Sequence, residues 1–470
     1  MKQFQPKDLI VVGCGAGGLS AAVSFLERCP GAKVVVLERA TREDRGGNTR
    51  WTKGFFRLYE DGRPTEDFGE RIDQYSLGQA DSAIVTTLTH KAQETVAWAR
   101  SNGVEMNLAE TYFLTSKGSR MMPRGGGAAV VEALAARFEQ LGGQIEYQCA
   151  ALDLILEDGR VVGVSGKDAN ELATSWRAPS VVLATGGFQG NKDLLAQHLG
   201  ERGRSLETIC PGGRNDRGEG ITMAIKAGAG RAGQFDMFHG EPSDPRTGKA
   251  EALVMIYPYG ILVNKEGRRF LDEGKDSVDE TFEDVAYHIW RDANQLAYLI
   301  VDQSLLQSDY KKAVLSGTEP ILADSIHDLA VALGIEPAAL AATVESYNSA
   351  CQPGPLDVTV KDGVSTRSLN PPKSNWARPI TQGPFGAWPM SSVITFTFGG
   401  VKTDTSGRAV TADGEPVPGL YVVGEAAGLY HHSYPGASSM LRAMVFGRLA
   451  AEDAAANLAG KPGAAHAYNV

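Results

Sequence analysis

Residues 9–20 read LIVVGCGAGGLS, an apolar strand that runs directly into a glycine-rich turn and the start of a helix. Within them Gly13, Gly15 and Gly18 fit the pattern G-x-G-x-x-G. In a turn of this kind the glycines allow a sharp bend, a close approach of the backbone to a pyrophosphate, and close contact between helix and strand. The free N–H groups and the dipole of the helix start then favour a phosphate. The segment therefore predicts a nucleotide-binding turn.

A second strand and an acid give the glycine turn its context. Residues 33–37 read KVVVL, and Glu38 follows at once, 20 residues after Gly18. An acid at this place can accept hydrogen bonds from the ribose hydroxyls of an adenosine. Strand, glycine turn, helix, strand and acid together predict an α/β, Rossmann-like domain that binds a dinucleotide.

Three later segments indicate which dinucleotide this is. Residues 45–52 read RGGNTRWT, residues 184–187 read ATGG, and Gly424 and Glu425 follow an apolar run near the end of the chain. With the first motif, and in this order, these segments resemble the fumarate reductase and succinate dehydrogenase flavoprotein superfamily over almost the whole chain. The resemblance implies FAD as the cofactor. It also implies a GR2-type FAD-binding domain that carries an inserted α+β capping domain.

The sequence pattern changes at two places, which suggests how the domains divide. From residue 234 to residue 378 glycine turns become fewer and amphipathic helices are expected, such as one at residues 335–350. We expect residues 234–378 to form the capping domain, which carries the substrate site. Residues 1–233 and 379–470 are then the two parts of the FAD-binding domain.

The resemblance also implies which residues hold the cofactor. It places Glu38 on the adenosine ribose, and Asn48 and Thr49 beside the flavin ring. It further implies that the last helix points its positive end at the flavin. The sequence itself places Ser438 and Ser439 where they can cap this helix. The complete set of residues expected to contact FAD is Gly13, Gly15, Ala16, Gly17, Gly18, Glu38, Arg39, Gly46, Gly47, Asn48, Thr49, Thr52, Gly54, Ala150, Ala184, Thr185, Gly186, Gly187, Asp216, Gly424, Glu425, Ser438, Ser439 and Leu441.

The positions that hold the substrate in fumarate reductases are different in this chain. A histidine of the family's HTMGG segment is replaced by Thr395 or Phe396, an arginine before the last helix by Tyr434, and an arginine proton donor by Ser277. The segments ITFTFGG, RFLDEG and YPG instead resemble tricarballylate dehydrogenase and its relatives. A tyrosine in a YPG-like segment also occurs in 3-ketosteroid 1-dehydrogenases, and the desaturase of 4-oxocyclohexanecarboxylate is a third relative by activity.

The chemistry shared by these dehydrogenases removes two hydrogens from adjacent carbons, next to a carbonyl or carboxyl group. A base takes the more acidic hydrogen as a proton, and the enolate that develops needs a hydrogen-bond donor. We expect Tyr434 to be that donor. His432 is a candidate base or donor near neutral pH. Tyr257 and Tyr259 are further candidates for the proton acceptor, with ordinary packing open as the alternative for both.

Three arginines are candidates for binding a substrate carboxylate, because a guanidinium holds a carboxylate through two parallel hydrogen bonds. Arg442 lies on the last helix, and Arg120 and Arg124 lie in the segment SRMMPRGGG. A surface salt bridge stays open as the alternative for Arg120 and Arg124. Thr395 and Phe396 are expected to line the same substrate site.

The sequence thus predicts an FAD-dependent dehydrogenase that acts on CH–CH groups of a small acid, such as a cyclic keto acid or tricarballylate. The alternatives are a reductase of an activated C=C bond, a ketosteroid dehydrogenase, and an electron carrier without a substrate of its own. No haem motif or iron–sulfur cysteine cluster occurs in the sequence. We therefore expect the electrons to pass to oxygen, a quinone or a separate redox protein.

Composition limits the partners and the location that we expect. The net charge of −10 argues against binding to nucleic acid or to an anionic membrane surface. No run of about 18 apolar residues occurs, so no membrane span is expected. The five cysteines are scattered without metal-binding spacing, and the opening MKQFQPKD lacks the apolar stretch of a secretory signal. We therefore expect no metal site and a cytoplasmic protein.

Overall fold

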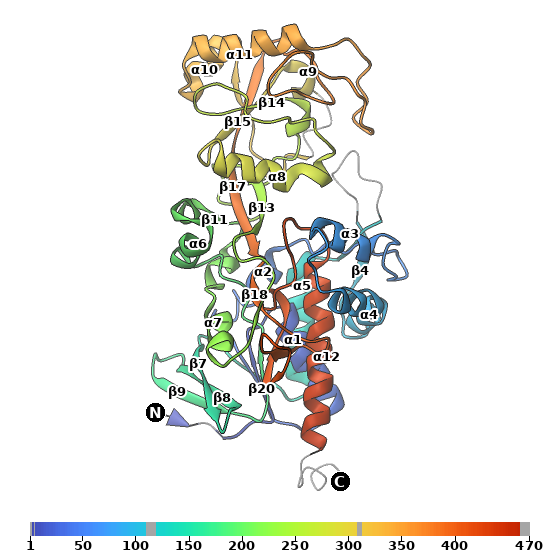
Figure 1. Ribbon diagram of the computed structural model, residues 1–470, viewed down its shortest axis with the longest axis vertical. Coiled ribbons are helices and arrows are strands. Elements are labelled where there is room, and N and C mark those ends of the chain that lie inside the picture. The colour runs from blue at the N-terminus through green and yellow to red at the C-terminus, as the bar shows by residue number, and fades with distance from the viewer. Residues whose placement is uncertain (1, 4, 110–118, 308–312, 461–470) are drawn as a thin grey trace.

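The computed structural model of the chain describes residues 2–3, 5–109, 119–307 and 313–460. Figure 1 shows an elongated molecule with a lower lobe, which contains the first and last helices, and an upper lobe built from the middle of the chain. Strand β17 (Phe385–Thr397) runs from the upper lobe towards the lower one. The lower end of this strand therefore lies where the two lobes meet.

The lower lobe is built on a six-stranded sheet with the strand order β19-β20-β10-β2-β3-β6. The strands from β20 to β6 pair in parallel, and β19 is antiparallel. The central strands are buried along their whole length, which is why they read as continuous apolar runs. This sheet confirms the predicted Rossmann-like α/β fold. Its strands are β2 (Leu9–Val12), β3 (Val34–Leu37), β6 (Gln144–Glu146), β10 (Val181–Leu183), β19 (Arg408–Val410) and β20 (Pro416–Val422).

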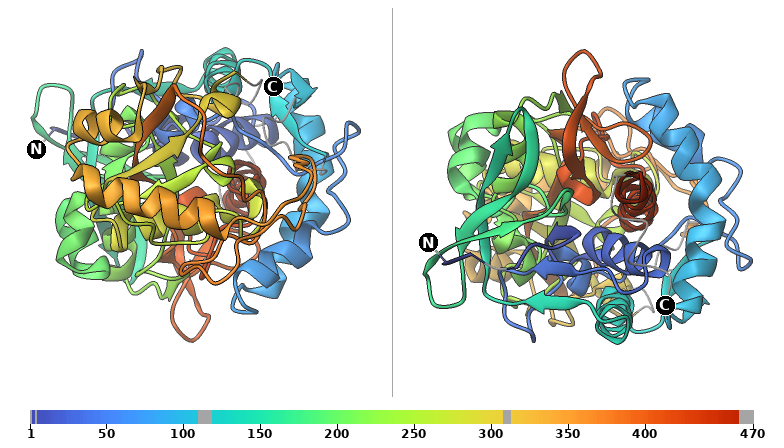
Figure 2. Two further views of the ribbon diagram at one scale, coloured as in Figure 1. Left: turned by 90° about the horizontal axis from the view of Figure 1, so that it is seen from above. Right: turned by 90° about the horizontal axis from the view of Figure 1, so that it is seen from below.

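Two helices of the lower lobe pack closely together. Helix α1 (Ala16–Arg28) follows the glycine turn, and α12 (Ser439–Ala459) is the last helix; Figures 1 and 2 show them side by side. Small residues allow this contact, since a Cβ at Gly447 would stand 2.3 Å from the carbonyl oxygen of Gly17. The other helices outside the upper lobe are α2 (Gly47–Trp51), α3 (Phe68–Tyr75), α4 (Ser82–Ser101), α5 (Gly126–Gln140), α6 (Lys192–Leu199), α7 (Glu219–Lys226), and the 3₁₀ helices η1 (Glu201–Ser205), η2 (Pro211–Asn215) and η5 (Gly424–Ala426).

Smaller sheets complete the lower lobe. A four-stranded sheet has the order β1-β9-β8-β7, and two pairs, β4 with β5 and β12 with β18, stand apart from it. In the part of the chain that the structure describes, none of the helices has both the length and the apolar character needed to cross a membrane. The strands are β1 (Lys2–Gln3), β4 (Met106–Leu108), β5 (Met121–Pro123), β7 (Ala150–Glu157), β8 (Arg160–Lys167), β9 (Ala173–Arg177), β12 (Arg231–Ala232) and β18 (Gly400–Val401).

The upper lobe has β17 at the centre of its sheet. The order is β11-β17-β15-β14, with β13 and β16 also paired to β17, so the chain keeps pairing with capping strands past residue 378. Helix α8 (Val278–Arg291) packs against β13 and β17. The other elements are β11 (Glu207–Thr208), β13 (Phe238–Ser243), η3 (Tyr257–Tyr259), β14 (Ile261–Val263), β15 (Ala297–Val301), α9 (Gln303–Leu306), β16 (Ile321–Ala323), α10 (Ile326–Leu333) and α11 (Pro337–Ala350).

Candidate active site

Two adjoining cavities lie between the glycine turn of the lower lobe and the strands of the upper lobe. We call the first the cofactor cavity; it begins at Glu38 and follows the glycine turn. We call the second the substrate cavity; it continues to His239 and the start of α12. Four residues line both cavities, so the two form one continuous site: Asn48, Thr49, Glu425 and Ala443.

Glu38 closes one end of the cofactor cavity. Its carboxylate accepts hydrogen bonds from the backbone N–H groups of Cys14, at 3.0 Å, and Ala40, at 2.8 Å. Burial raises the pKa of Glu38, while these backbone hydrogen bonds act against the rise. The acid therefore fastens the glycine turn to the end of β3 and also lines the cavity, as expected for the residue beside an adenosine ribose.

The glycine turn leaves no room for side chains. Gly13 has a φ of +106°, and a Cβ there would stand 2.3 Å from the carbonyl oxygen of Ala184. The N–H of Ala16, at the start of α1, donates to the hydroxyl of Thr49 at 3.1 Å, which ties α2 to the turn. The buried hydroxyl of Thr185 lines the cavity and has no hydrogen-bond partner within the described residues. A cradle of backbone with an unsatisfied polar atom fits a phosphate-bearing cofactor.

Two acids, one buried and one partly buried, lie further along the cofactor cavity. The side-chain amide of Gln189 donates to Asp216 at 2.6 Å and to Glu425 at 3.2 Å. Burial raises the pKa of Asp216 well above its usual range, and Glu425 raises it further. Burial likewise raises the pKa of Glu425, to about 7. Such carboxyl groups, partly protonated, suit hydrogen bonds with the hydroxyl groups of a ligand.

Most residues predicted to contact FAD line this continuous site. Those on the cofactor cavity are Gly13, Gly15, Ala16, Gly17, Glu38, Arg39, Gly46, Gly47, Asn48, Thr49, Ala150, Ala184, Thr185, Gly186, Asp216, Gly424 and Glu425. Three line the substrate cavity instead: Thr52, Gly54 and Ser439. Four line neither cavity: Gly18, Gly187, Ser438 and Leu441. Gly18 has the predicted packing role, because a Cβ there would stand 2.0 Å from the carbonyl oxygen of Gly13.

Tyr434 lies at the start of α12, where it lines the substrate cavity. Its phenolic oxygen accepts hydrogen bonds from the backbone N–H groups of Ser438 and Ser439, both at 2.9 Å, and donates to the Ser439 hydroxyl at 3.1 Å. The predicted serine capping of α12 is wrong for Ser438. Its side chain makes no cap hydrogen bond and instead contacts the hydroxyl of Tyr430 at 2.8 Å. The tyrosine oxygen thus satisfies two of the free N–H groups at the start of α12, whereas a capping side chain usually binds the N–H of the second or third helical residue.

His239 is a functional candidate that the sequence interpretation missed. It lies on β13, lines the substrate cavity and is 3% exposed. Its ring contacts Glu283 at 2.8 Å through Nδ1 and Glu241 at 3.1 Å through Nε2. Burial alone would lower the pKa of His239, but the hydrogen bonds to the two glutamates outweigh it and raise the pKa to about 10. The alternation His-x-Glu in FHGEPS was a signal for a shared face of a strand.

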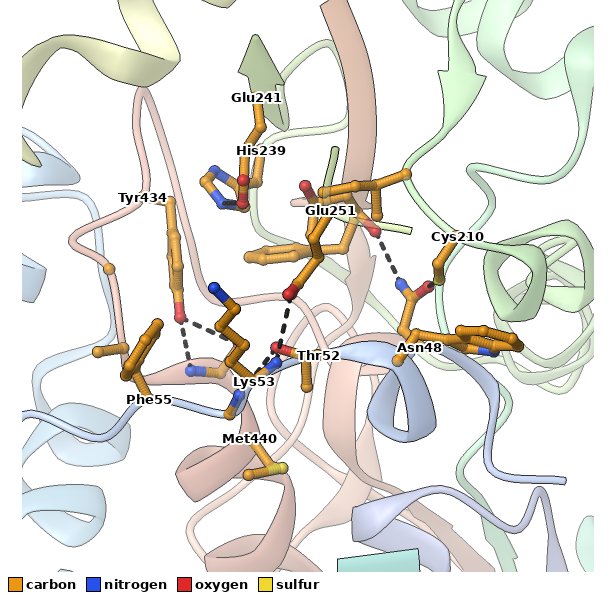
Figure 3. A pocket seen from close by; sticks show the side chains of 18 of the residues that line it. Asn48, Thr52, Lys53, Phe55, Cys210, His239, Glu241, Glu251, Tyr434 and Met440 are labelled. Atoms are coloured by element: carbon orange, nitrogen blue, oxygen red, sulfur yellow. Dashed lines mark hydrogen bonds and ion pairs between the residues drawn. The ribbon is translucent and has the colours of Figure 1, made fainter. Parts of the chain in front are cut away.

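Glu251 is a second candidate that the sequence interpretation missed. Its carboxylate accepts hydrogen bonds from the backbone N–H of Lys53, at 3.3 Å, and from the side chain of Thr52. Burial raises the pKa of Glu251 to about 7, with a further contribution from Glu241. Figure 3 shows the side chains of Tyr434, Lys53 and Glu251 around the same cavity. A carboxylate that titrates near neutral pH can both accept and donate a proton there.

The three arginines predicted to bind a carboxylate do not form a clamp. Arg124 lies outside the substrate cavity, with its side chain 73% exposed and paired to Glu105 at 3.2 Å. Arg120 lines the cavity but binds both oxygens of Asp279, at 2.7 and 2.6 Å. Arg442 also lines the cavity; it donates to the carbonyl oxygen of Ala427 at 2.9 Å and lies over the ring of Tyr430.

Three of the predicted catalytic residues lie away from the substrate cavity. Tyr257 is fully buried in the core of the upper lobe, where its hydroxyl contacts Thr281 at 2.7 Å. Tyr259 lines a separate small pocket of the upper lobe. His432 is exposed and lines neither cavity, and its backbone is left-handed, with a φ of +56°. The assignments of Tyr257, Tyr259 and His432 as catalytic residues are therefore corrected.

The remaining predicted residues lie where the two cavities join. Thr395 and Phe396, at the end of β17, both line the substrate cavity as expected. The carbonyl oxygen of Thr395 accepts a hydrogen bond from the amide of Asn48 at 2.7 Å. The ring of Phe396 packs against His239 and Tyr434, with centroids 5.1 and 5.0 Å apart. Phe396 thus gives the site an apolar wall beside these two side chains.

Comparison with known proteins gives a consistent result. The family model described as an FAD binding domain matches residues 8–441. The chain is 26% identical to the NADH:acrylate oxidoreductase of Vibrio harveyi over 95% of this chain and 50% of that protein. It is 29% identical to the cytochrome-linked fumarate reductase of Shewanella frigidimarina, over 95% of this chain and 77% of that one. It thus spans half the length of the first relative and about three quarters of the second.

Two further similarities concern a dehydrogenase and a solved structure. The chain is 30% identical to the 4-oxocyclohexanecarboxylate 2-dehydrogenase of Sinomonas cyclohexanicum, over 77% of this chain and 65% of that protein. Its fold matches the open conformation of a flavocytochrome c3 fumarate reductase with a TM-score of 0.78, at 24% identity, over 96% of this chain and 78% of that one. The cofactor cavity and the matching family agree on FAD as the cofactor.

Proposed function

This chain belongs to the FAD binding domain family, and from that premise we propose that it is a dehydrogenase of compact cyclic ketones or keto acids. The reaction would introduce a double bond between the α and β carbons of the carbonyl compound. The observation that carries the proposal is the hydroxyl of Tyr434, which receives two backbone N–H hydrogen bonds and lines the substrate cavity.

Tyr434 is suited to polarising a carbonyl group. Two N–H donors on its oxygen draw electron density from the O–H bond, so the hydroxyl becomes a stronger donor. In the protein alone its proton faces the hydroxyl of Ser439 at 3.1 Å, and a substrate carbonyl oxygen would take the place of that acceptor. The start of α12 adds a positive helix end beside the oxygen on which negative charge grows.

Glu251 is the proton acceptor in this proposal. With a pKa of about 7 it is ionised in much of the population at neutral pH, and it retains enough basicity to take a proton from a carbon beside a polarised carbonyl. FAD, when bound, supplies the acceptor for the hydrogen that leaves the neighbouring carbon as hydride. The protein's own tasks are to hold the carbonyl at Tyr434, present the adjacent carbon to Glu251 and exclude water.

The walls of the substrate cavity favour a compact, largely apolar substrate. The cavity of about 210 Å³, part of which the flavin ring would take, exceeds the ~150 Å³ in which an engineered protein cavity holds benzene. Its apolar lining residues are Trp51, Phe55, Ile209, Leu253, Met255, Phe282, Phe396 and Met440. Lys53 lines the substrate cavity and is our candidate partner for a single substrate carboxylate.

Reduction of an activated C=C bond is the second candidate. The same pKa of about 7 leaves Glu251 protonated in part of the population, which suits a proton donor. One relative is named as a fumarate reductase and another as an NADH:acrylate oxidoreductase, which supports this direction as well. The polar groups of the substrate cavity suit both directions of the reaction. Which direction operates therefore depends on whether the protein turns over the saturated or the unsaturated compound.

A steady-state assay distinguishes the two candidates. The purified FAD-loaded protein is given saturated cyclic ketones and keto acids with an artificial electron acceptor, and enones and unsaturated acids with an artificial electron donor. We expect the saturated cyclic compounds to yield α,β-unsaturated products at the higher kcat/KM. Efficient turnover of unsaturated compounds alone would favour the reductase.

A further inference from the structure

The loop that presents Tyr434 has an unusual backbone. His432 and Ala437, which are not glycines, both have a φ of +56°, and Gly436 has a φ of +76°. Side chains rarely adopt such left-handed conformations, so a loop that contains two of them needs support from its surroundings. The contacts around residues 432–437 therefore show what keeps the tyrosine in place.

The first support comes from the upper lobe. Glu283, on helix α8, is 7% exposed, and its carboxylate accepts a hydrogen bond from the backbone N–H of Tyr434 at 2.8 Å. The other oxygen of the same carboxylate contacts Nδ1 of His239 at 2.8 Å. The rings of His239 and Tyr434 lie 4.6 Å apart. One carboxylate thus holds the backbone of Tyr434 and the imidazole that packs on its ring.

The second support lies one helical turn earlier. Asp279 contacts Arg57 at 3.4 Å, and the Nε of Arg57 donates to the carbonyl oxygen of Pro435 at 3.2 Å. The backbone N–H of Arg57 also donates to the carbonyl oxygen of Ala437, at 3.2 Å. Because residues four apart lie on the same face of a helix, Asp279 and Glu283 both face this loop.

We propose that Asp279 and Glu283 are positioning residues that hold the Tyr434 loop in its reactive geometry, so that helix α8 of the upper lobe completes the site. The inference rests on the proposed role of Tyr434. Neither carboxylate lies between substrate and flavin in this account. Glu283 acts through the backbone of Tyr434 and through His239, and Asp279 acts through Arg57 and the carbonyl of Pro435.

The groups around His239 give a second readout. Glu241 on β13 and Glu283 on α8 face its two ring nitrogens, and Tyr434 and the aromatic rings of Phe282 and Phe396 surround it. A glutamine in place of Glu283 carries no charge, and its amide nitrogen cannot accept a hydrogen bond. Glu283→Gln should therefore lower the pKa of His239, and it should also weaken the hold on Tyr434.

The test compares Glu283→Gln, Asp279→Asn and the control Asp284→Asn in the FAD-loaded protein. Asp284 lies next to Glu283 on α8, but it pairs with Lys275 of the upper lobe at 3.1 Å. We expect Glu283→Gln and Asp279→Asn to lower kcat about ten- to a hundredfold, as for loss of reactive geometry, with FAD affinity within about threefold. KM should stay within about threefold in Glu283→Gln, whereas it should change in Asp279→Asn as well, because Asp279 holds Arg120 and both line the substrate cavity. The control should match the parent protein. Melting curves and FAD content establish that each variant is folded.

Histidine NMR decides the matter without any substrate. The signal of His239 is assigned by its absence in His239→Asn. It should show an imidazole that stays protonated above pH 8 in the parent protein and that titrates at least one pH unit lower in Glu283→Gln. The inference is overturned if folded Glu283→Gln has the kcat of the parent protein and its His239 titrates as in the parent. It is also overturned if the Asp284→Asn control loses as much kcat as Glu283→Gln. The rates are compared in whichever direction the parent protein works, so failure of the proposed dehydrogenation leaves this test intact.

Discussion

The phenolic oxygen of Tyr434 lies 2.9 Å from the backbone nitrogen of Ser439. The residue after Tyr434, Pro435, accepts a hydrogen bond from the side chain of Arg57. The tyrosine oxygen therefore satisfies two of the free backbone N–H groups at the start of α12. A hydroxyl in this place combines the donors of a helix start with a proton of its own. The site thus has a ready position for an oxygen that becomes negatively charged.

Tyr434→Phe should lower kcat by about 10²–10³, since loss of one donor to a developing oxyanion typically has that effect. KM should change much less, because a hydrogen bond to a neutral carbonyl contributes only about 1 kcal/mol. The ring stays in place, so FAD binding should be close to normal. Steady-state kinetics with a flavin titration checks this. If kcat stays within about threefold of the parent value, a much smaller loss than the one expected, the hydroxyl is not the hydrogen-bond donor to the developing oxyanion.

The rate should depend on the ionisation of Glu251. As the proton acceptor it works only when deprotonated, so kcat/KM for dehydrogenation should rise as the pH passes through about 7 and level off above. Glu251→Gln should lose about 10²–10⁴ in rate and also lose this dependence. Because Glu425 also has a pKa of about 7, a pH dependence that survives in Glu251→Gln would assign the ionisation to Glu425 instead.

Glu38→Ala should weaken FAD binding roughly ten- to a hundredfold, the range expected for loss of charge-assisted hydrogen bonds to ribose. The variant also frees the N–H groups of Cys14 and Ala40, which the carboxylate holds in the parent protein. Equilibrium titration of the flavin-free protein with FAD measures the change. An unaltered dissociation constant would place the adenosine elsewhere.

Lys53→Met should distinguish an acidic substrate from a neutral one. If Lys53 binds the substrate carboxylate, KM for a keto acid should rise about ten- to a hundredfold, whereas KM for its methyl ester should hardly change. Arg124→Met is the matched control, because it removes a cation that lies outside the substrate cavity and pairs with Glu105. Equal changes of KM for acid and ester would show that Lys53 does not bind the carboxylate.

The cofactor cavity could be predicted from the sequence because each of its key residues is required by the local backbone of a short segment. Gly13 needs a positive φ and a path free of side chains, and Glu38 ends a strand at a fixed distance from the turn. A cofactor that lies along the backbone therefore leaves its pattern in short segments. The predicted dinucleotide fold and the FAD cofactor were confirmed for this reason.

The substrate cavity could be predicted only in part: Thr395, Phe396 and Tyr434 line it as expected, but its polar groups from the upper lobe and their supports were missed. His239, Glu251 and Glu283 come from a strand, a loop and a helix of the upper lobe, and only the fold brings two of them into contact. Sequence proximity to a motif misled in the case of His432, which is exposed and lines neither cavity. Arg120 and Arg124 belong to one short segment, but only Arg120 lines the cavity.

Anaerobic mixing of the FAD-loaded protein with a saturated cyclic ketone tests the central claim most directly. The measurement follows the visible flavin absorption in a single turnover and identifies the organic product by mass spectrometry. Our account predicts that the flavin colour is lost as an α,β-unsaturated ketone forms, and that Tyr434→Phe and Glu251→Gln slow both events together. If the colour persists with every saturated ketone and keto acid, while an unsaturated acid restores the colour of chemically bleached protein, dehydrogenation next to a carbonyl is contradicted.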